Sequence, residues 1–333
     1  MPLTPAAARR VARECAVQTF DPAAKAINED YGTHWDGKQL QRWAAKLGGQ
    51  VTARQDRDLR AAAQGHPPAR PLNAPELLVV AVDGGRVQTT QKNPATDSRW
   101  KEDKVLALSS YRPGDGTAEH PPQRLVTTCV GTMREAAQFG PLVRLEALRR
   151  GLRQATWVLL LGDGAAWIDG LAEACLADVP IVRIVDWYHM MEYLHAGAAA
   201  ARLPLEPLEA LMYDGRVEEV LIRLRKAQEG VGVPQEGDPV EHPRRRLAET
   251  IRYLTNHRQE MKYGEYRRKG WPIGSGTVES AVKQMGQRVK GSEKFWNLEG
   301  VEPILALRGL WLSEDDRWSQ HWDSCPAYTP VVS

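Results

Sequence analysis

Two aspartates stand at the ends of strongly apolar segments, each beside glycine residues. Asp83 follows residues 77–82, and Asp163 follows residues 157–161. Such runs predict buried strands, and catalytic groups in sheet-based α/β folds gather where strands end. A carboxylate at the edge of a core is costly unless its charge is compensated, for example by a cation. The adjacent glycines would let the backbone turn and a substrate approach, although each Asp-Gly pair alone is also typical of a turn.

A third acid, Glu279, lies in a segment with helical periodicity that begins after a glycine-rich stretch. Apolar residues repeat there at the spacing of one helix face: Val278, Val282, Met285 and Val289. A helix over residues 276–290 would bury that face and present Glu279 and Lys283 on the neighbouring one. The same two residues also fit an ordinary surface pair at i and i+4.

Basic residues are concentrated around this helix. Between residues 261 and 294, eight lysines and arginines stand against three acids. These basic residues are Lys262, Arg267, Arg268, Lys269, Lys283, Arg288, Lys290 and Lys294. With tyrosine and tryptophan interleaved, the segment suits contact with a phosphate backbone and stacking on bases or sugars. A solvated basic face is the alternative.

The chain changes its periodicity in the middle. We predict strands at residues 77–90, 104–108, 124–130, 157–161 and 181–185, with helices at 132–149 and 165–177. Three strands, a helix, a strand, a helix and a strand indicate an α/β fold with a mixed sheet and helices on both faces. Residues 76–186 and 271–313 would form this domain, and residues 187–270 a helical insertion.

The N-terminal residues 1–66 read as helical, with the outline of a helix-turn-helix. A helix through Leu40 and Leu47 would end at Gly48, and residues 51–75 resemble a linker. DNA could meet the outer face of that helix, formed by Lys38, Gln39, Arg42 and Lys46. A helical hairpin with a solvated face explains the same pattern and is favoured by the sequence alone. Residues 314–333 are expected to form a poorly ordered tail.

Composition excludes several classes of protein. The 333 residues carry a net charge of only +2, so binding to nucleic acid must depend on local patches. The four cysteines are far apart and form no CxxC pair, which argues against a zinc ribbon or a disulfide framework. No apolar run approaches the roughly 18 residues of a membrane span, and no glycine-rich phosphate loop follows the first strand. We expect a cytoplasmic protein without membrane contact.

Four motifs, taken in order, resemble a known family: VDGG, LGDGAAWI, VDWYHMMEYL and IGSGTVESAVKQMGQRVKGSEKFW. From residue 77 to 311 the chain is similar to DDE transposases of bacterial insertion sequences, most of all the ISKra group and more distantly Mutator-like transposases. The resemblance implies a ribonuclease H-like fold in a nucleoid-associated bacterial protein. It implies Asp83, Asp163 and Glu279 as catalytic acids and ligands of Mg²⁺ or Mn²⁺, with two ions, acting on double-stranded DNA as a homodimer.

The motif DWYH adds two auxiliary residues. Asp186 and His189 match the acid-x-x-His motif of the family, and Asp186 is an alternative to Asp163 as the second acid. Asp186 also suits the N-cap of the following helix. Lys283, Arg288 and Lys290 would hold DNA near the ions. The alternatives are a ribonuclease H-like nuclease without strand transfer and a non-catalytic DNA-binding derivative of a transposase.

Overall fold

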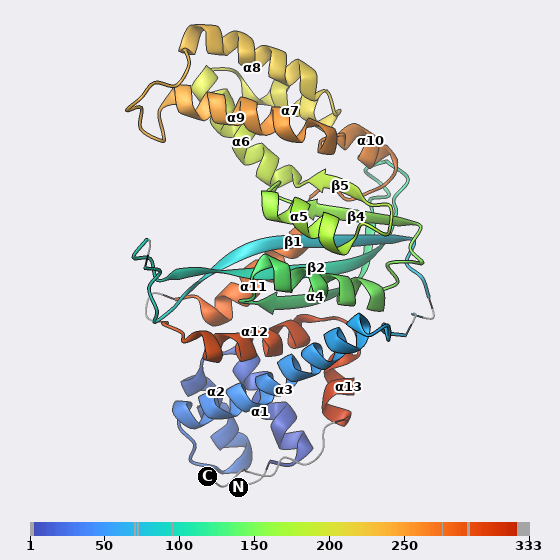
Figure 1. Ribbon diagram of the computed structural model, residues 1–333, viewed down its shortest axis with the longest axis vertical. Coiled ribbons are helices and arrows are strands. Elements are labelled where there is room, and N and C mark those ends of the chain that lie inside the picture. Colours follow the sequence, from blue (N-terminus) through green and yellow to red (C-terminus); the bar gives the residue numbers. More distant parts are fainter. Residues whose placement is uncertain are drawn as a thin grey trace.

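A five-stranded mixed sheet lies at the centre of the computed structural model (Figure 1), which describes residues 3–69, 71, 73–94, 96–274, 276–291 and 294–324. Its strands are β1 (Leu77–Gln88), β2 (Trp100–Arg112), β3 (Gln123–Thr132), β4 (Trp157–Gly162) and β5 (Val182–Val185). They lie in the order β3-β2-β1-β4-β5. The first three strands pair antiparallel, and β4 and β5 continue the sheet in parallel from β1. The predicted mixed sheet is confirmed.

Both faces of the sheet are covered by helices, which explains why β1 is apolar without alternation. Leu78, Val80 and Val82 share one core with α4 (Ala136–Arg149) and α5 (Ala166–Cys175). The residues between them point to the other face, where α11 (Gly276–Val289) and α12 (Leu298–Leu312) pack. Asp83 continues the series that faces α11.

Helices α6 to α10 follow β5 and lie at one end of the molecule (Figure 1). They are α6 (Trp187–Ala201), α7 (Leu205–Tyr213), α8 (Val217–Val231), α9 (Pro243–His257) and α10 (Tyr263–Arg268), with the short 3₁₀ helix Arg258–Glu260 after α9. Contacts among α6, α7, α8 and α9 give this bundle its own part of the core. Among the described residues, no helix is long and apolar enough to cross a membrane.

The N-terminal helices differ from the prediction. Helices α1 (Pro5–Val17) and α2 (Phe20–Tyr31) precede a 27-residue helix, α3 (Gly37–Ala63). The predicted end at Gly48 and the predicted linker from residue 51 are therefore wrong. A Cβ atom at Gly48 would lie 2.2 Å from the carbonyl oxygen of Pro303, so this glycine serves the close packing of α3 on α12.

The predicted tail is also partly wrong. Residues 317–323 form helix α13 (Arg317–Asp323), in which Trp318, His321 and Trp322 are buried. The tryptophan ring of Trp318 makes edge contacts with Trp311 of α12 and with Trp322. This aromatic cluster holds the segment on the protein. Residues 325–333 lie outside the described residues.

Candidate active site

Three acids from distant parts of the sequence line one cavity of about 170 Å³: Asp83, Asp163 and Glu279. The register of the sheet explains the first two, because Ala81 pairs with Leu161 in the parallel ladder. Two residues after this pair, Asp83 and Asp163 therefore lie at the same edge of the sheet. Glu279 comes from the first turn of α11, which packs on β1.

The glycines beside the two aspartates differ in what surrounds them. A Cβ atom at Gly84 would lie 2.5 Å from a carboxylate oxygen of Glu102, and one at Gly85 would lie 2.5 Å from Asp103. These two glycines make room for acids of β2. Gly164 has a φ of +85°, and a Cβ atom there would meet the ring of His257 at 2.9 Å.

The three acids interact electrostatically. Burial raises the pKa of Asp83 from 3.8 to about 6. Repulsion from Asp163 and Glu279 adds to this rise, whereas the Gly84 N–H, which donates to Asp83 Oδ1 at 2.7 Å, and His189 oppose it. A carboxyl group that responds to two other carboxylates in one cavity is typical of a functional site.

The loop that carries Asp163 is anchored from two sides. Asp163 Oδ1 accepts a hydrogen bond from the backbone N–H of Ala165 at 2.8 Å. The hydroxyl of Tyr253, on α9, donates to the Asp163 carbonyl oxygen at 2.8 Å. The Tyr253 ring stacks on Tyr193 of α6 with 3.9 Å between centroids. Sequence analysis missed both tyrosines, because only the packing of the insertion against this loop reveals their role.

Asp186 and His189 line the same cavity as the three acids. Asp186 follows β5 and is buried, and its Oδ1 accepts from the His189 backbone N–H at 2.8 Å, which confirms the N-cap role. Nδ1 of His189 lies 3.5 Å from Glu192 Oε2. Glu192 also lines the cavity and was missed, although its i+3 spacing from His189 is visible in the sequence.

The donor chemistry of the cavity suits a hard divalent cation, because the acids offer oxygen ligands of the kind that Mg²⁺ and Mn²⁺ prefer. The arrangement is not a ready-made ligand set. Among the described residues, no three histidine, cysteine or acidic side chains stand together in a way that could hold a metal ion. One oxygen each of Asp83 and Asp163 accepts from its own loop backbone, which leaves the second oxygen of each carboxylate for another partner.

Arg288, predicted to hold DNA, is buried in the core. Its side chain is 2 % exposed, and Nε donates to the Cys15 carbonyl oxygen at 2.6 Å. The guanidinium lies over the rings of Phe20 and Trp296, and burial lowers its pKa to about 10. The prediction for Arg288 is wrong because this side of α11 faces α1 and α2.

The other basic residues do not form one patch. Lys283 is 77 % exposed, with Nζ 4.0 Å from Glu279 Oε2, and Lys290, half-buried, directly follows the end of the same helix. Lys269 lies instead near the start of β4, with Nζ 5.6 Å from the ring of Trp157. Asp163 follows the other end of β4, and the two ends of this strand are roughly 16 Å apart at the usual rise per residue. Arg267 and Arg268 are the last two residues of α10, and Lys269 is its C-cap.

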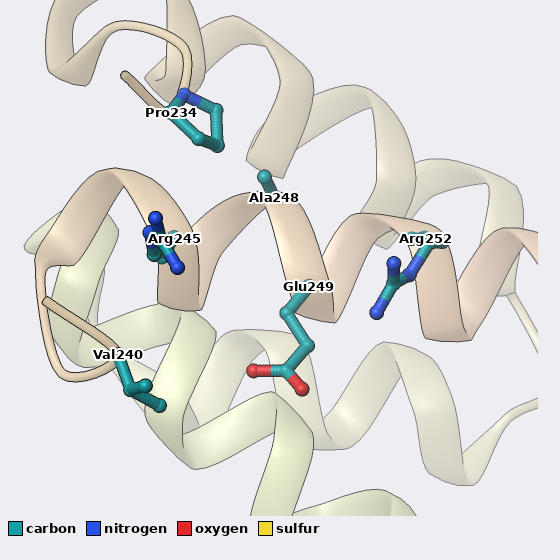
Figure 2. Close-up of a pocket in the computed structure, with 6 residues that line it drawn as sticks. All are labelled: Pro234, Val240, Arg245, Ala248, Glu249 and Arg252. Atoms are coloured by element: carbon teal, nitrogen blue, oxygen red, sulfur yellow. The ribbon is translucent and has the colours of Figure 1, made fainter. Parts of the chain in front are cut away.

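A second cavity, of about 370 Å³, lies on α9 and the loop before it (Figure 2). Its lining residues are Pro234, Val240, Arg245, Ala248, Glu249 and Arg252. Figure 2 shows Arg245 and Arg252 on either side of Glu249 along the helix. Neither arginine has a hydrogen-bond or ion-pair partner within the described ranges. The cavity lies on α9, the helix whose Tyr253 hydroxyl donates to the Asp163 carbonyl oxygen.

Comparison with known proteins gives little. No family model matches the chain, and no curated protein does. Among solved structures, the Drosophila P element transposase strand transfer complex is similar, with a TM-score of 0.30 and 12% identity over 93% of this chain and 79% of that one. A likeness at this level carries no argument about the function of this chain.

Proposed function

We propose that this protein is a DDE transposase that cleaves DNA at the ends of an insertion sequence and joins them to a target. The observation that carries the proposal is the shared cavity of Asp83, Asp163 and Glu279, in which Asp83 responds electrostatically to both other acids. The strand order, with β1, β2 and β3 antiparallel and β4 and β5 parallel to β1, agrees with a ribonuclease H-like sheet. The resemblance of the motifs to the ISKra group points to the same activity.

Asp83, Asp163 and Glu279 would hold two Mg²⁺ or Mn²⁺ ions in this proposal. Bound ions would supply Lewis-acid polarisation of the scissile phosphate and favour deprotonation of the attacking water or 3′-hydroxyl. The carboxylate oxygens of Asp83 and Asp163 that now accept from their own backbone would keep each side chain in place. Asp186 and His189 would shape the opposite wall as auxiliary residues.

Double-stranded DNA is the proposed partner, bound by a homodimer because two element ends must be joined. Lys283 lies on the helix of Glu279 and Lys290 directly follows it, and both would contact phosphates beside the acids. Arg245 and Arg252 would contact the same DNA from the insertion. Arg267, Arg268 and Lys269 would meet it further away, at the opposite end of β4.

The proposal is tested with DNA that carries the flanking sequences of this reading frame. We expect cleavage and strand transfer with Mg²⁺ or Mn²⁺ and none with a chelator. Asp163→Asn is expected to abolish both reactions while DNA affinity and melting temperature stay near normal, whereas Glu173→Gln, an exposed change on α5, leaves them intact. Cleavage without strand transfer would instead identify a nuclease, and undiminished cutting by Asp163→Asn would remove this residue from the site.

A non-catalytic derivative of a transposase is the second candidate. It is favoured by the observation that no three acidic, histidine or cysteine side chains of the described segments are arranged as metal ligands. This candidate predicts DNA binding that is unchanged by Asp83→Asn or Glu279→Gln, and no cleavage with any divalent cation. The cleavage assay above therefore separates the two candidates.

A further inference from the structure

A charged cavity of about 500 Å³ lies away from the acids, between α3, α4 and α13. Its lining includes four arginines and three acids, together with His321. The arginines are Arg54, Arg149, Arg150 and Arg317, and the acids are Asp58, Glu146 and Asp315. These described residues leave one net positive charge on the wall of the cavity.

Two of the arginines are neutralised by the three acids. Arg149 contacts Glu146 and Asp58, each at 2.5 Å. Arg317 contacts the other oxygen of Glu146 at 2.9 Å and Asp315 at 2.7 Å. This network engages all three carboxylates of the cavity, and the remaining two arginines form no ion pair with any of them.

Arg150 and Arg54 are those two arginines. Arg150 Nη2 donates to the neutral hydroxyl of Ser110 at 2.7 Å, while its Nε is buried without a hydrogen-bond partner in the described structure. Burial lowers the pKa of Arg150, and the nearby carboxylates of Asp315, Glu146 and Glu314 oppose this shift only in part. Arg54 has no hydrogen bond or ion pair with any described residue.

His321 offers these arginines no negative charge. It is 4 % exposed, and burial together with repulsion from Arg54 lowers its pKa to about 4, so that its ring is neutral at pH 7. Arg54 and Arg150 are both half-buried, and neither forms an ion pair with a described carboxylate. A bound anion would complete the compensation of their charges.

We propose that this cavity binds a phosphate group through Arg54 and Arg150. Guanidinium groups are the side chains best suited to phosphate oxygens, because their planar N–H groups can donate in pairs. The volume exceeds that of a free phosphate ion and lies within the range of small-ligand sites. The group could therefore belong to inorganic phosphate, to a phosphorylated small molecule or to the 5′ end of a DNA strand.

Thermal melting of the full chain in the presence of inorganic phosphate tests the proposal, with sodium chloride at matched ionic strength as reference. The melting temperature is expected to rise by about 3 °C at ten times the dissociation constant. Arg54→Gln and Arg150→Gln are each expected to weaken phosphate binding at least about tenfold, the effect of losing one charged hydrogen-bond partner. Arg57→Gln, an exposed arginine on the same helix as Arg54, is the matched control and keeps the full response.

A second measurement identifies the source of the phosphate and is independent of folding defects in the variants. The wild-type protein is titrated with inorganic phosphate and with a short single strand of DNA, with and without a 5′-phosphate. The NMR signal of His321 reports binding, because the pKa of this histidine rises when an anion offsets the charge of Arg54. A response to inorganic phosphate alone supports a small ligand, and a response that requires the 5′-phosphate supports a DNA end. Equal responses to sodium chloride and phosphate, or an equal loss in Arg57→Gln, overturn the proposal.

Discussion

Replacing Asp83 with asparagine is expected to stabilise the folded protein at pH 8 while destroying its proposed activity. Asparagine has nearly the same shape and can still accept the hydrogen bond that the Gly84 N–H donates to Asp83 Oδ1 at 2.7 Å. It carries no charge, so it is not repelled by Asp163 and Glu279. A site built from mutually repelling acids is less stable than its neutral variant, which is a common cost of function.

The size and the sign of this change in stability follow from the pKa of Asp83, which is 3.8 ordinarily and about 6 in the folded protein. Because the folded value is raised, protonated Asp83 contributes stability that is fully present below about pH 4 and is lost as the pH rises through 6. The difference corresponds to about 3 kcal/mol. Screening by solvent at this half-buried side chain reduces the realised loss to about 1–2 kcal/mol.

Thermal melting of wild type and Asp83→Asn at pH 4.5 and pH 8 measures this difference. We expect the variant to melt about 2–5 °C higher at pH 8 and at nearly the wild-type temperature at pH 4.5. Mg²⁺ should raise the melting temperature of the wild type more than that of the variant. Glu119→Gln, an exposed change in the β2–β3 loop, controls for net charge. A variant that is no more stable than wild type at pH 8 would refute the reasoning.

Three further predictions concern binding and packing. Lys283→Ala is expected to weaken DNA binding similarly for all sequences and to lower the salt dependence by about one unit of slope, measured by titration at several salt concentrations; a sequence-selective loss would contradict phosphate contact. Arg288→Ala is expected to cost about 2–4 kcal/mol in denaturant unfolding, and a stable variant with impaired DNA binding would contradict its burial. Gly48→Ala is expected to lower the free energy of unfolding by about 1–3 kcal/mol, because the new methyl group would clash with the carbonyl of Pro303. Gly49→Ala, whose Cβ atom would have nothing within 4 Å, is expected to raise it by about 0.5–1 kcal/mol. Equal effects of the two changes would contradict the close packing of α3 on α12.

The sheet could be predicted because its signals are local. Each strand is an apolar run bounded by turn residues, and a parallel pairing of the first and fourth strands then brings Asp83 and Asp163 to one edge. The stripe on α11 was also readable, since Val278, Met285 and Val289 are buried as its spacing requires. Patterns within a few residues suffice for these features.

The errors arose where the outcome depends on a distant partner. In the sequence, Arg288 is one of several basic residues in a positively charged segment. In the structure it is buried against α1, where it donates to the carbonyl of Cys15, 273 residues earlier in the chain. Gly48 has the same local signature whether it ends a helix or lets another helix approach, and only Pro303 distinguishes these roles. Arg54 and Arg150 share a cavity only because α3 packs on α4. No window of sequence contains both members of such a pair.

The insertion contributes to the site beyond adding surface. Tyr253 donates to the Asp163 carbonyl oxygen at 2.8 Å, and Tyr263 donates to the Val185 carbonyl oxygen at 3.0 Å. These two bonds tie the ends of β4 and β5 to α9 and α10, and both strand ends lead directly into residues that line the acid cavity. Each hydroxyl holds a backbone carbonyl, so the insertion fixes the backbone, while one oxygen of Asp83 and one of Asp163 are held by their own loops and the second oxygen of each is left for another partner. In the proposed function, such a frame would keep the repelling carboxylates of Asp83 and Asp163 in place and leave one oxygen of each for the ions.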